Sequence, residues 1–170
     1  MRVHLLRAVN VGGARLPMAE LRALAEGLGA ADVRTHIASG NLVCTPPGDG
    51  FDRALERAVE ARFGFFREVI SRSADELEAA LAAHPFDVVD AKHSHVYFLQ
   101  AVPDAAAVAT FEAADWSPDD VRVVGADLHV RYGDGIAGSR LTPQRIHSAL
   151  GTVGTGRNLT TVRALLEMLR

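Results

Sequence analysis

The stretch VRTHIASGNLVCT, residues 33–45, decides the fold because it places two strand-like segments on either side of a tight turn. Val33 to Ile37 and Asn41 to Thr45 have the composition of β-strands, and Ser39-Gly40-Asn41 supplies the small polar residues of the turn. Two strands joined by so short a connection pair as an antiparallel hairpin. The sequence therefore predicts an antiparallel sheet in this part of the chain.

The segments on both sides of the hairpin complete a recognisable order of elements. Val3 to Val9 has the apolar composition of a buried strand, and apolar residues recur at helical spacing from Leu21 to Leu28. A second helical stripe runs from Phe51 to Phe63, and Phe65 to Ser71 is rich enough in apolar residues for a fourth strand. The order β-α-β-β-α-β is typical of a ferredoxin-like sheet covered by two helices.

The second half of the chain resembles the first in its order of elements. Ser73 and Glu76 form a capping box at the start of a further helix, which Pro85 ends. A strand, a helix, a hairpin and two helices follow from His95 onward. We therefore predict an α+β protein with two ferredoxin-like subdomains, each with an antiparallel sheet, the second ending in an extra C-terminal helix. Residues 1–84 are expected to form the first subdomain, 85–94 a linker, and 95–170 the second.

Composition and charge restrict the classes of function. The 170 residues include 18 basic and 21 acidic side chains, a formal net charge of -3 that argues against a nucleic-acid binder. The single cysteine, Cys44, excludes an intrachain disulfide and fits a reducing compartment. The first apolar run is interrupted by charged residues, and no stretch approaches the ~20 apolar residues of a membrane span. These features predict a cytoplasmic protein that does not enter a membrane.

Two motifs with possible chemistry lack the context that the chemistry needs. The glycines of residues 133–138 have the spacing G-x-G-x-x-G, but no helix begins inside the motif, so we interpret it as a surface loop. His93 and His95 stand two apart without a third ligand at a suitable spacing. We therefore predict neither a metal nor a cofactor.

Two loops rich in glycine and arginine are better candidates. Residues 151–158 read GTVGTGRN and precede the last predicted helix, so they are either an anion-binding loop or a helix–helix turn with Asn158 or Thr160 as the N-cap. Residues 7–13 read RAVNVGG and follow the first strand. Because a buried guanidinium needs a partner, Arg7 either pairs with an internal acid such as Asp32 or Glu20 or faces a ligand.

These same polar turns resemble a known bacterial family, the domain of unknown function 1697. The resemblance lies in LRAVNVGG at residues 6–13, in Met18 and Leu21, in Ser39-Gly40-Asn41, and in TGRNLTTV at residues 155–162. Ala8, Leu159 and Thr160 depart from the family pattern of glycine, tryptophan and asparagine. The resemblance implies a two-subdomain α+β fold of ferredoxin-like halves and no established activity.

Together, these observations favour a protein that binds a small anionic ligand, carrying phosphate or carboxylate, between its subdomains. Arg7 and Arg157 would hold the anion, backbone N–H groups at the glycines would add neutral donors, and the polar side chains would orient the ligand. The expected ligand-binding residues are Arg7, Asn10, Gly12, Gly13, Ser39, Asn41, Arg157 and Asn158.

Other functions remain open at this point. One is an enzyme, a hydrolase or transferase, that uses the same pocket with His36 as acid or base, since histidine titrates near neutral pH. Another is a module that associates with nucleic acid or with a protein partner. The residues do not set an oligomeric state.

Overall fold

The structure, a computed structural model, describes all residues from 1 to 170 and divides the chain into two compact units. The first unit comprises residues 1–77 together with 165–170, and the second comprises residues 78–164. Each unit contains one four-stranded antiparallel sheet with helices, so the predicted α+β class is confirmed.

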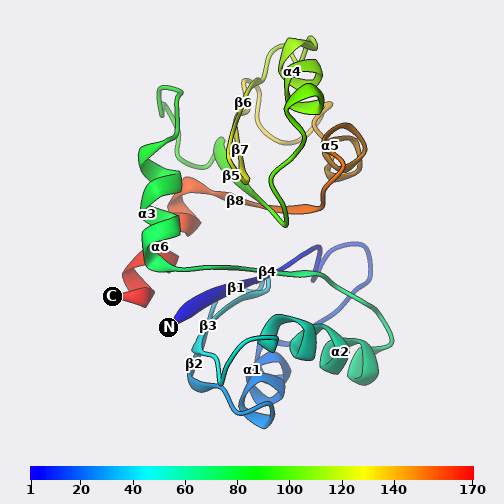
Figure 1. Cartoon of the computed structure of the whole chain (residues 1–170), viewed down its shortest axis with the longest axis vertical. Helices are drawn as coiled ribbons and strands as arrows, with labels where there is room; N and C mark the ends of the chain where they lie inside the picture. The colour runs from blue at the N-terminus through cyan, green and yellow to red at the C-terminus, as the bar shows by residue number, and fades with distance from the viewer. The chain divides into compact units, whose positions relative to one another are not determined.

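The sheet of the first unit has the strand order β2-β3-β1-β4. Its elements are β1 (Arg2–Leu6), α1 (Met18–Gly27), β2 (Ala31–His36), β3 (Asn41–Thr45), α2 (Phe51–Phe63) and β4 (Val69–Arg72). Because β3 lies between β1 and β2, α1 connects two strands that are not neighbours, as in a split β-α-β unit. Figure 1 shows α1 and α2 together on one side of this sheet.

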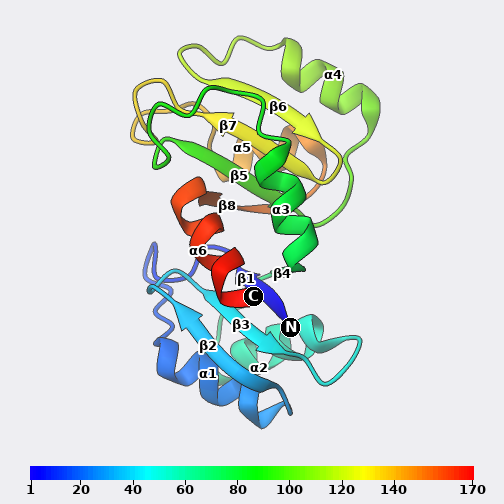
Figure 2. The same cartoon turned by 90° about the vertical axis from the view of Figure 1, so that its left-hand side faces the viewer.

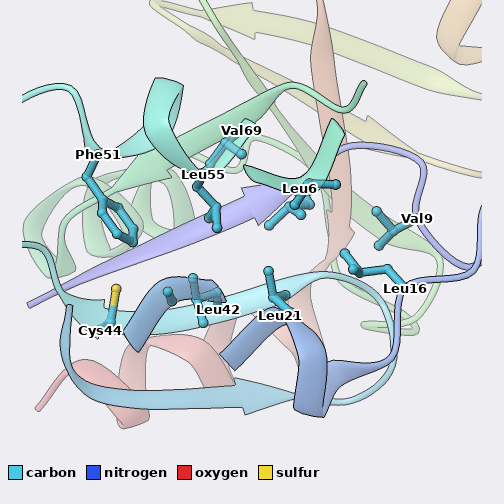
Figure 3. Packing of buried hydrophobic residues seen from close by; sticks show 11 residues of the cluster. Leu6, Val9, Leu16, Leu21, Leu42, Cys44, Phe51, Leu55 and Val69 are labelled. Atoms are coloured by element: carbon cyan, nitrogen blue, oxygen red, sulfur yellow. The ribbon is translucent and has the colours of Figure 1, made fainter. Parts of the chain in front are cut away.

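The core of the first unit forms between those two helices and the sheet. Leu6 of β1, Leu42 of β3 and Val69 of β4 point toward Leu21 of α1 and Leu55 of α2, as Figure 3 shows. Leu6, Leu42, Leu21 and Leu55 are fully buried. The alternation of side chains along a strand explains this, because residues two apart share one face of the sheet.

The second unit repeats the sheet with the order β6-β7-β5-β8, as Figure 2 shows. Its strands and the helices between them are β5 (Ser94–Leu99), α4 (Ala105–Ala113), β6 (Asp120–Val124), β7 (Asp127–Arg131), α5 (Pro143–Leu150) and β8 (Gly154–Asn158). Phe111 of α4 and Ile146 of α5 pack against Tyr97 of β5 and Val130 of β7. The hydroxyl groups of Tyr97 and Tyr132 lie 2.7 Å apart and satisfy each other inside this core.

The chain passes from one unit to the other within each of the two remaining helices. They are α3 (Ala74–Ala82) and α6 (Leu159–Leu169). The predicted capping box at the start of α3 is confirmed. The Ser73 N–H donates to Glu76 Oε2 at 2.7 Å, and the Glu76 N–H donates to Ser73 Oγ at 3.2 Å. No helix is long and apolar enough to cross a membrane.

The structure corrects several sequence-based strand boundaries, among them those of β1 and β4. β1 ends at Leu6 rather than Val9, because Ala8 takes a left-handed backbone conformation with φ of 50°. β4 begins at Val69 rather than Phe65, whose ring instead stacks on Phe63 of α2 with centroids 5.8 Å apart.

The prediction that the second half lacks a final strand was wrong. Residues 154–158, expected to be a turn between two helices, form β8 and pair with β5. A Cβ on Gly156 would lie 2.7 Å from Cζ of Tyr97, so the close approach of β8 to β5 requires glycine there. The extra C-terminal helix, α6, follows the strand directly.

Candidate functional site

The first loop, residues 7–17 between β1 and α1, has an unusual backbone. The φ angle is positive at Ala8 (50°), Asn10 (57°), Gly12 (58°) and Gly13 (89°), and it is negative at Val9 and Val11. Left-handed residues interspersed with others can turn neighbouring N–H groups toward one side, as in the amide nests that attract anions. The N–H groups of Val11, Gly12 and Gly13 have no hydrogen-bond partner within the protein, and all three residues are exposed.

The side chain of Asn10 holds this loop in shape. Its Oδ1 accepts from the Leu16 N–H at 2.8 Å, while its Nδ2 donates to the carbonyl oxygens of Leu16 at 3.1 Å and Ala38 at 2.7 Å. The last of these bonds joins the first loop to the hairpin turn between β2 and β3. Both N–H groups of the Asn10 amide are therefore engaged within the protein, and its role in this structure is support of the loop.

The hairpin turn packs directly against the first loop. The Leu6 N–H donates to the Gly40 carbonyl at 2.9 Å, and a Cβ on Gly40 would lie 2.5 Å from Cγ2 of Val9. Asn41 is fully buried and donates to the His36 carbonyl at 3.1 Å and to Ser39 Oγ at 2.8 Å. The first loop and the hairpin turn, which contain the six predicted site residues of the first unit, are therefore neighbours. Ser39 and Asn41 support the turn, and His36 ends β2.

Replacement of Gly40 by alanine is expected to destabilise the protein by about 2 kcal/mol or more, because the new Cβ would add overpacking to a strained left-handed backbone. The φ angle of Gly40 is 76°. The free energy of unfolding in urea measures the loss. Gly48→Ala is the control, because Gly48 has no atom within 4 Å of an added Cβ and no positive φ. Equal stabilities of the two variants would contradict the expected contact.

Three arginines lie at the first loop and make it cationic. Arg15 is exposed and lines a cavity of about 440 Å³ together with Asn10 and Ala38. Arg67 donates from Nε to the Ala8 carbonyl at 3.0 Å. Arg7 pairs with Glu68 through NH1 and Oε2 at 3.4 Å, and its buried Nε has no partner. One carboxylate against three guanidinium groups leaves net positive charge beside the free N–H groups of the loop.

The acid that pairs with Arg7 differs from the two expected from the sequence. Glu20 instead pairs with Arg62 at 3.2 Å, and Asp32 accepts from the Thr45 hydroxyl at 3.3 Å. Glu68 takes the place beside Arg7 because β4 is the strand that lies next to β1, an adjacency that the order of residues does not reveal. The Arg7 N–H also donates to the Glu68 carbonyl at 3.0 Å.

The remaining two predicted site residues belong to the second unit. Arg157 lies in β8, and its NH1 donates to Thr155 Oγ1 at 2.7 Å and to the Gly156 carbonyl at 2.8 Å. Burial lowers the pKa of Arg157 to about 10, against the opposing effect of Tyr97. Asn158 Oδ1 accepts from the Thr161 N–H at 2.8 Å, so the expected N-cap interaction at the last helix is confirmed. A single ligand held by Arg7 and Arg157 stays a prediction.

The first unit also contains a buried polar cluster, formed by His4, Asp52 and Ser71, that the sequence did not indicate. His4 is 1% exposed, and its Nδ1 lies 2.6 Å from Asp52 Oδ1. Ser71 pairs with His4 across β1 and β4 and hydrogen-bonds to the same carboxylate. Burial raises the pKa of Asp52, but the hydrogen bonds from His4 and Ser71, with the charges of His4 and Arg2, outweigh it, so the pKa lies below its usual value.

This cluster borders a cavity of about 510 Å³. A carboxylate that holds an imidazole through Nδ1 leaves Nε2 as the atom that can accept a proton, as in the general base of a catalytic triad. However, Nε2 of His4 is buried without a partner, so the atom that would take a proton is closed to solvent. No signal along the chain could have found the cluster, because its three residues lie on separate elements.

The structure offers no group of three His, Cys, Asp or Glu side chains that could hold a metal ion. The glycine-rich residues 133–138 lie in the loop between β7 and α5, in agreement with the interpretation of this motif as a surface loop.

The fold and the first loop define a two-unit α+β protein with a cationic, amide-lined loop, and comparisons with known proteins place it in a family. The chain belongs to the family described as "Protein of unknown function (DUF1697)", whose model matches residues 1–129. The resemblance seen in the sequence is thereby confirmed. No curated protein matches the chain.

One solved structure shares the fold over nearly the whole chain. It is a conserved bacterial protein, SP0830 from Streptococcus pneumoniae, with a TM-score of 0.77 and 22% sequence identity. The alignment covers 99% of this chain and 97% of the other. At this identity the likeness shows the fold alone.

Proposed function

We propose that the protein binds a small anionic ligand, carrying phosphate or carboxylate, at the first loop. The observation that carries this proposal is the set of three exposed and unpartnered N–H groups, of Val11, Gly12 and Gly13, in a loop with four positive φ angles between Ala8 and Gly13. A neutral nest of this kind gains its specificity for anions from the directions of its N–H dipoles.

The charges around the loop support the same ligand class. Arg15 has no hydrogen bond or ion pair within the protein, and it borders the cavity beside the loop. Its planar guanidinium can donate two parallel hydrogen bonds to a phosphate or carboxylate. Arg7 retains a buried Nε without a partner, while its long contact with Glu68 is weaker than a bidentate pair.

Titration of inorganic phosphate and of succinate, followed by isothermal calorimetry and by amide chemical shifts, tests the proposal. The Arg15→Ala variant is expected to bind about 10-fold more weakly with unchanged folding stability, since a hydrogen bond to a charged group contributes roughly 1.5–3 kcal/mol. Gly12→Val tests the nest without a change of charge, because a β-branched residue disfavours a φ of 58°.

The control is Arg57→Ala, which removes one exposed arginine from α2. Shifts of the Val11, Gly12 and Gly13 amides that saturate with phosphate or succinate would support the proposal. Equal affinities of the parent protein, Arg15→Ala and Gly12→Val would overturn it. The separate prediction that Arg7 and Arg157 hold the same anion requires non-additive effects in a double-mutant cycle with Arg7→Ala and Arg157→Ala.

A further inference from the structure

The only tryptophan of the chain, Trp116, lies between α4 and β6 beside an open cavity of the second unit. Its Nε1–H donates to the Phe111 carbonyl at 2.7 Å. Its ring packs on the Phe111 ring with centroids 5.0 Å apart and planes tilted by 43°. The indole is therefore held at its N–H edge and by one aromatic neighbour, while it stays only partly buried.

The cavity has the dimensions of a small-molecule site. Its volume is about 630 Å³, within the range of roughly 300–1,000 Å³ that ligand pockets occupy. It is lined by Trp116, Thr142, Gln144, Arg145, Ser148 and Ala149. The last four residues belong to α5, which buries Ile146 and Leu150 in the core and leaves these others exposed.

The polar groups that line the cavity are largely uncommitted. The side chains of Gln144 and Ser148 make no hydrogen bond within the protein. The Arg145 guanidinium has one long contact, from NH1 to the Arg140 carbonyl at 3.5 Å. No acidic residue lines the cavity. One indole ring, one cation without a carboxylate and two free polar side chains thus border the same space.

We propose that this cavity binds a small planar aromatic molecule that carries an anionic group, of the chemistry shared by a nucleoside monophosphate and an aromatic carboxylate. The ring stacks on the indole of Trp116, an interaction that tolerates any planar π-system. The anionic group accepts hydrogen bonds from Arg145, and Gln144 and Ser148 supply further donors. All the residues that line this cavity belong to the second unit, whereas the first loop belongs to the first unit.

Tryptophan fluorescence reports on this site alone, because Trp116 is the only tryptophan. The probes are AMP, adenosine, ribose 5-phosphate and benzoate, with N-acetyltryptophanamide as the correction for collisional quenching. AMP or benzoate is expected to change the fluorescence to saturation, adenosine to bind about 10-fold more weakly than AMP for lack of the charge, and ribose 5-phosphate to leave the signal unchanged. If AMP saturates the signal and benzoate does not, the ligand is assigned as a nucleotide. If benzoate saturates it and AMP does not, the ligand is assigned as an aromatic carboxylate.

Variants separate this site from the first loop. Arg145 is exposed, so Arg145→Gln is expected to keep the fold and to weaken binding of the saturating probe about 10-fold. Trp116→Leu is expected to weaken the same probe by a comparable factor in calorimetry. Arg57→Gln and Arg15→Ala are expected to leave the fluorescence titration unchanged, so loss of phosphate binding in Arg15→Ala alone would leave this inference intact.

Two results would overturn the inference. One is a fluorescence change that stays linear up to roughly 10 mM probe, far above the ~1 mM dissociation constant of a weak complex. The other is an unchanged dissociation constant in Arg145→Gln, which is decisive even if Trp116→Leu fails to fold.

Discussion

The second unit is expected to lose stability steadily as the pH falls from about 6.5 to about 4. Burial lowers the pKa of His95 to about 4, and burial together with the neighbouring His84 lowers the pKa of His129 to about 4. In the unfolded chain both histidines have a pKa near 6.5. Between pH 6.5 and 4 the unfolded state therefore binds more protons than the folded state, and the free energy of unfolding decreases as the pH falls. Above pH 6.5 both states are neutral and these residues cause no pH dependence.

The expected size follows from the difference of about 2.5 pH units between the unfolded and folded values of each histidine. Each residue then contributes a slope of about 1.4 kcal/mol per pH unit, or about 3 kcal/mol of destabilisation once the pH reaches 4. Trp116 lies in the same unit, so urea unfolding followed by its fluorescence at several pH values measures the effect.

His95→Phe isolates the contribution of one histidine. The buried Nδ1 of His95 has no partner, and its ring contacts Tyr132 edge to face with centroids 5.1 Å apart, so phenylalanine keeps an aromatic ring there while it gives up the hydrogen bond to the His93 backbone. This variant is expected to reduce the slope by about 1.4 kcal/mol per pH unit. His147→Ala, which changes an exposed histidine on α5, is expected to leave it unaltered. A stability that is independent of pH between 6.5 and 4 would contradict the prediction.

Replacement of Leu55 by alanine is expected to destabilise the first unit by about 2–5 kcal/mol. Leu55 is fully buried on α2 and points toward Leu6 of β1 and Val69 of β4, as Figure 3 shows. The truncation removes apolar contact and leaves a cavity that a sheet and a helix cannot close without movement of both.

Urea unfolding followed by circular dichroism, with hydrogen exchange of the β1 amides, measures this loss. Leu55→Met keeps the volume and is expected to cost less than about 1.5 kcal/mol. Glu60 lies on the exposed side of the same helix, so Glu60→Ala is expected to change the free energy of unfolding by less than about 0.5 kcal/mol. A loss in Leu55→Ala no larger than that in Glu60→Ala would show that the core does not depend on this residue.

Much of the fold could be predicted from local patterns. Turn residues predict the hairpin of residues 33–45, and apolar spacing predicts the helix of residues 51–63. The Ser73–Glu76 capping box also forms as expected. β8 could not be predicted this way, because its residues GTGRN have low strand propensity. That strand exists because Gly154 and Gly156 allow close pairing with β5.

The candidate site was predictable only in part. Residues 7–13 and 39–41 could be selected as polar turns, and the structure brings these two turns together through Asn10 and Gly40. The pairing of Arg7 with Glu68 and the meeting of His4 with Asp52 depend on which strands and helices become neighbours. The spacing of residues along the chain does not predict such contacts.

The sequence by itself determined the helices and most of the strands, because backbone propensity, capping and apolar periodicity act over a few neighbouring residues. It also determined the left-handed positions at which glycine favours a tight turn. Only the tertiary structure decided the partner of each charge, the exposure of the Val11–Gly13 amides and the place of Trp116 beside α5. The physical reason is that burial and charge pairing depend on distances between residues far apart in the chain, which packing sets only once the sheets have formed.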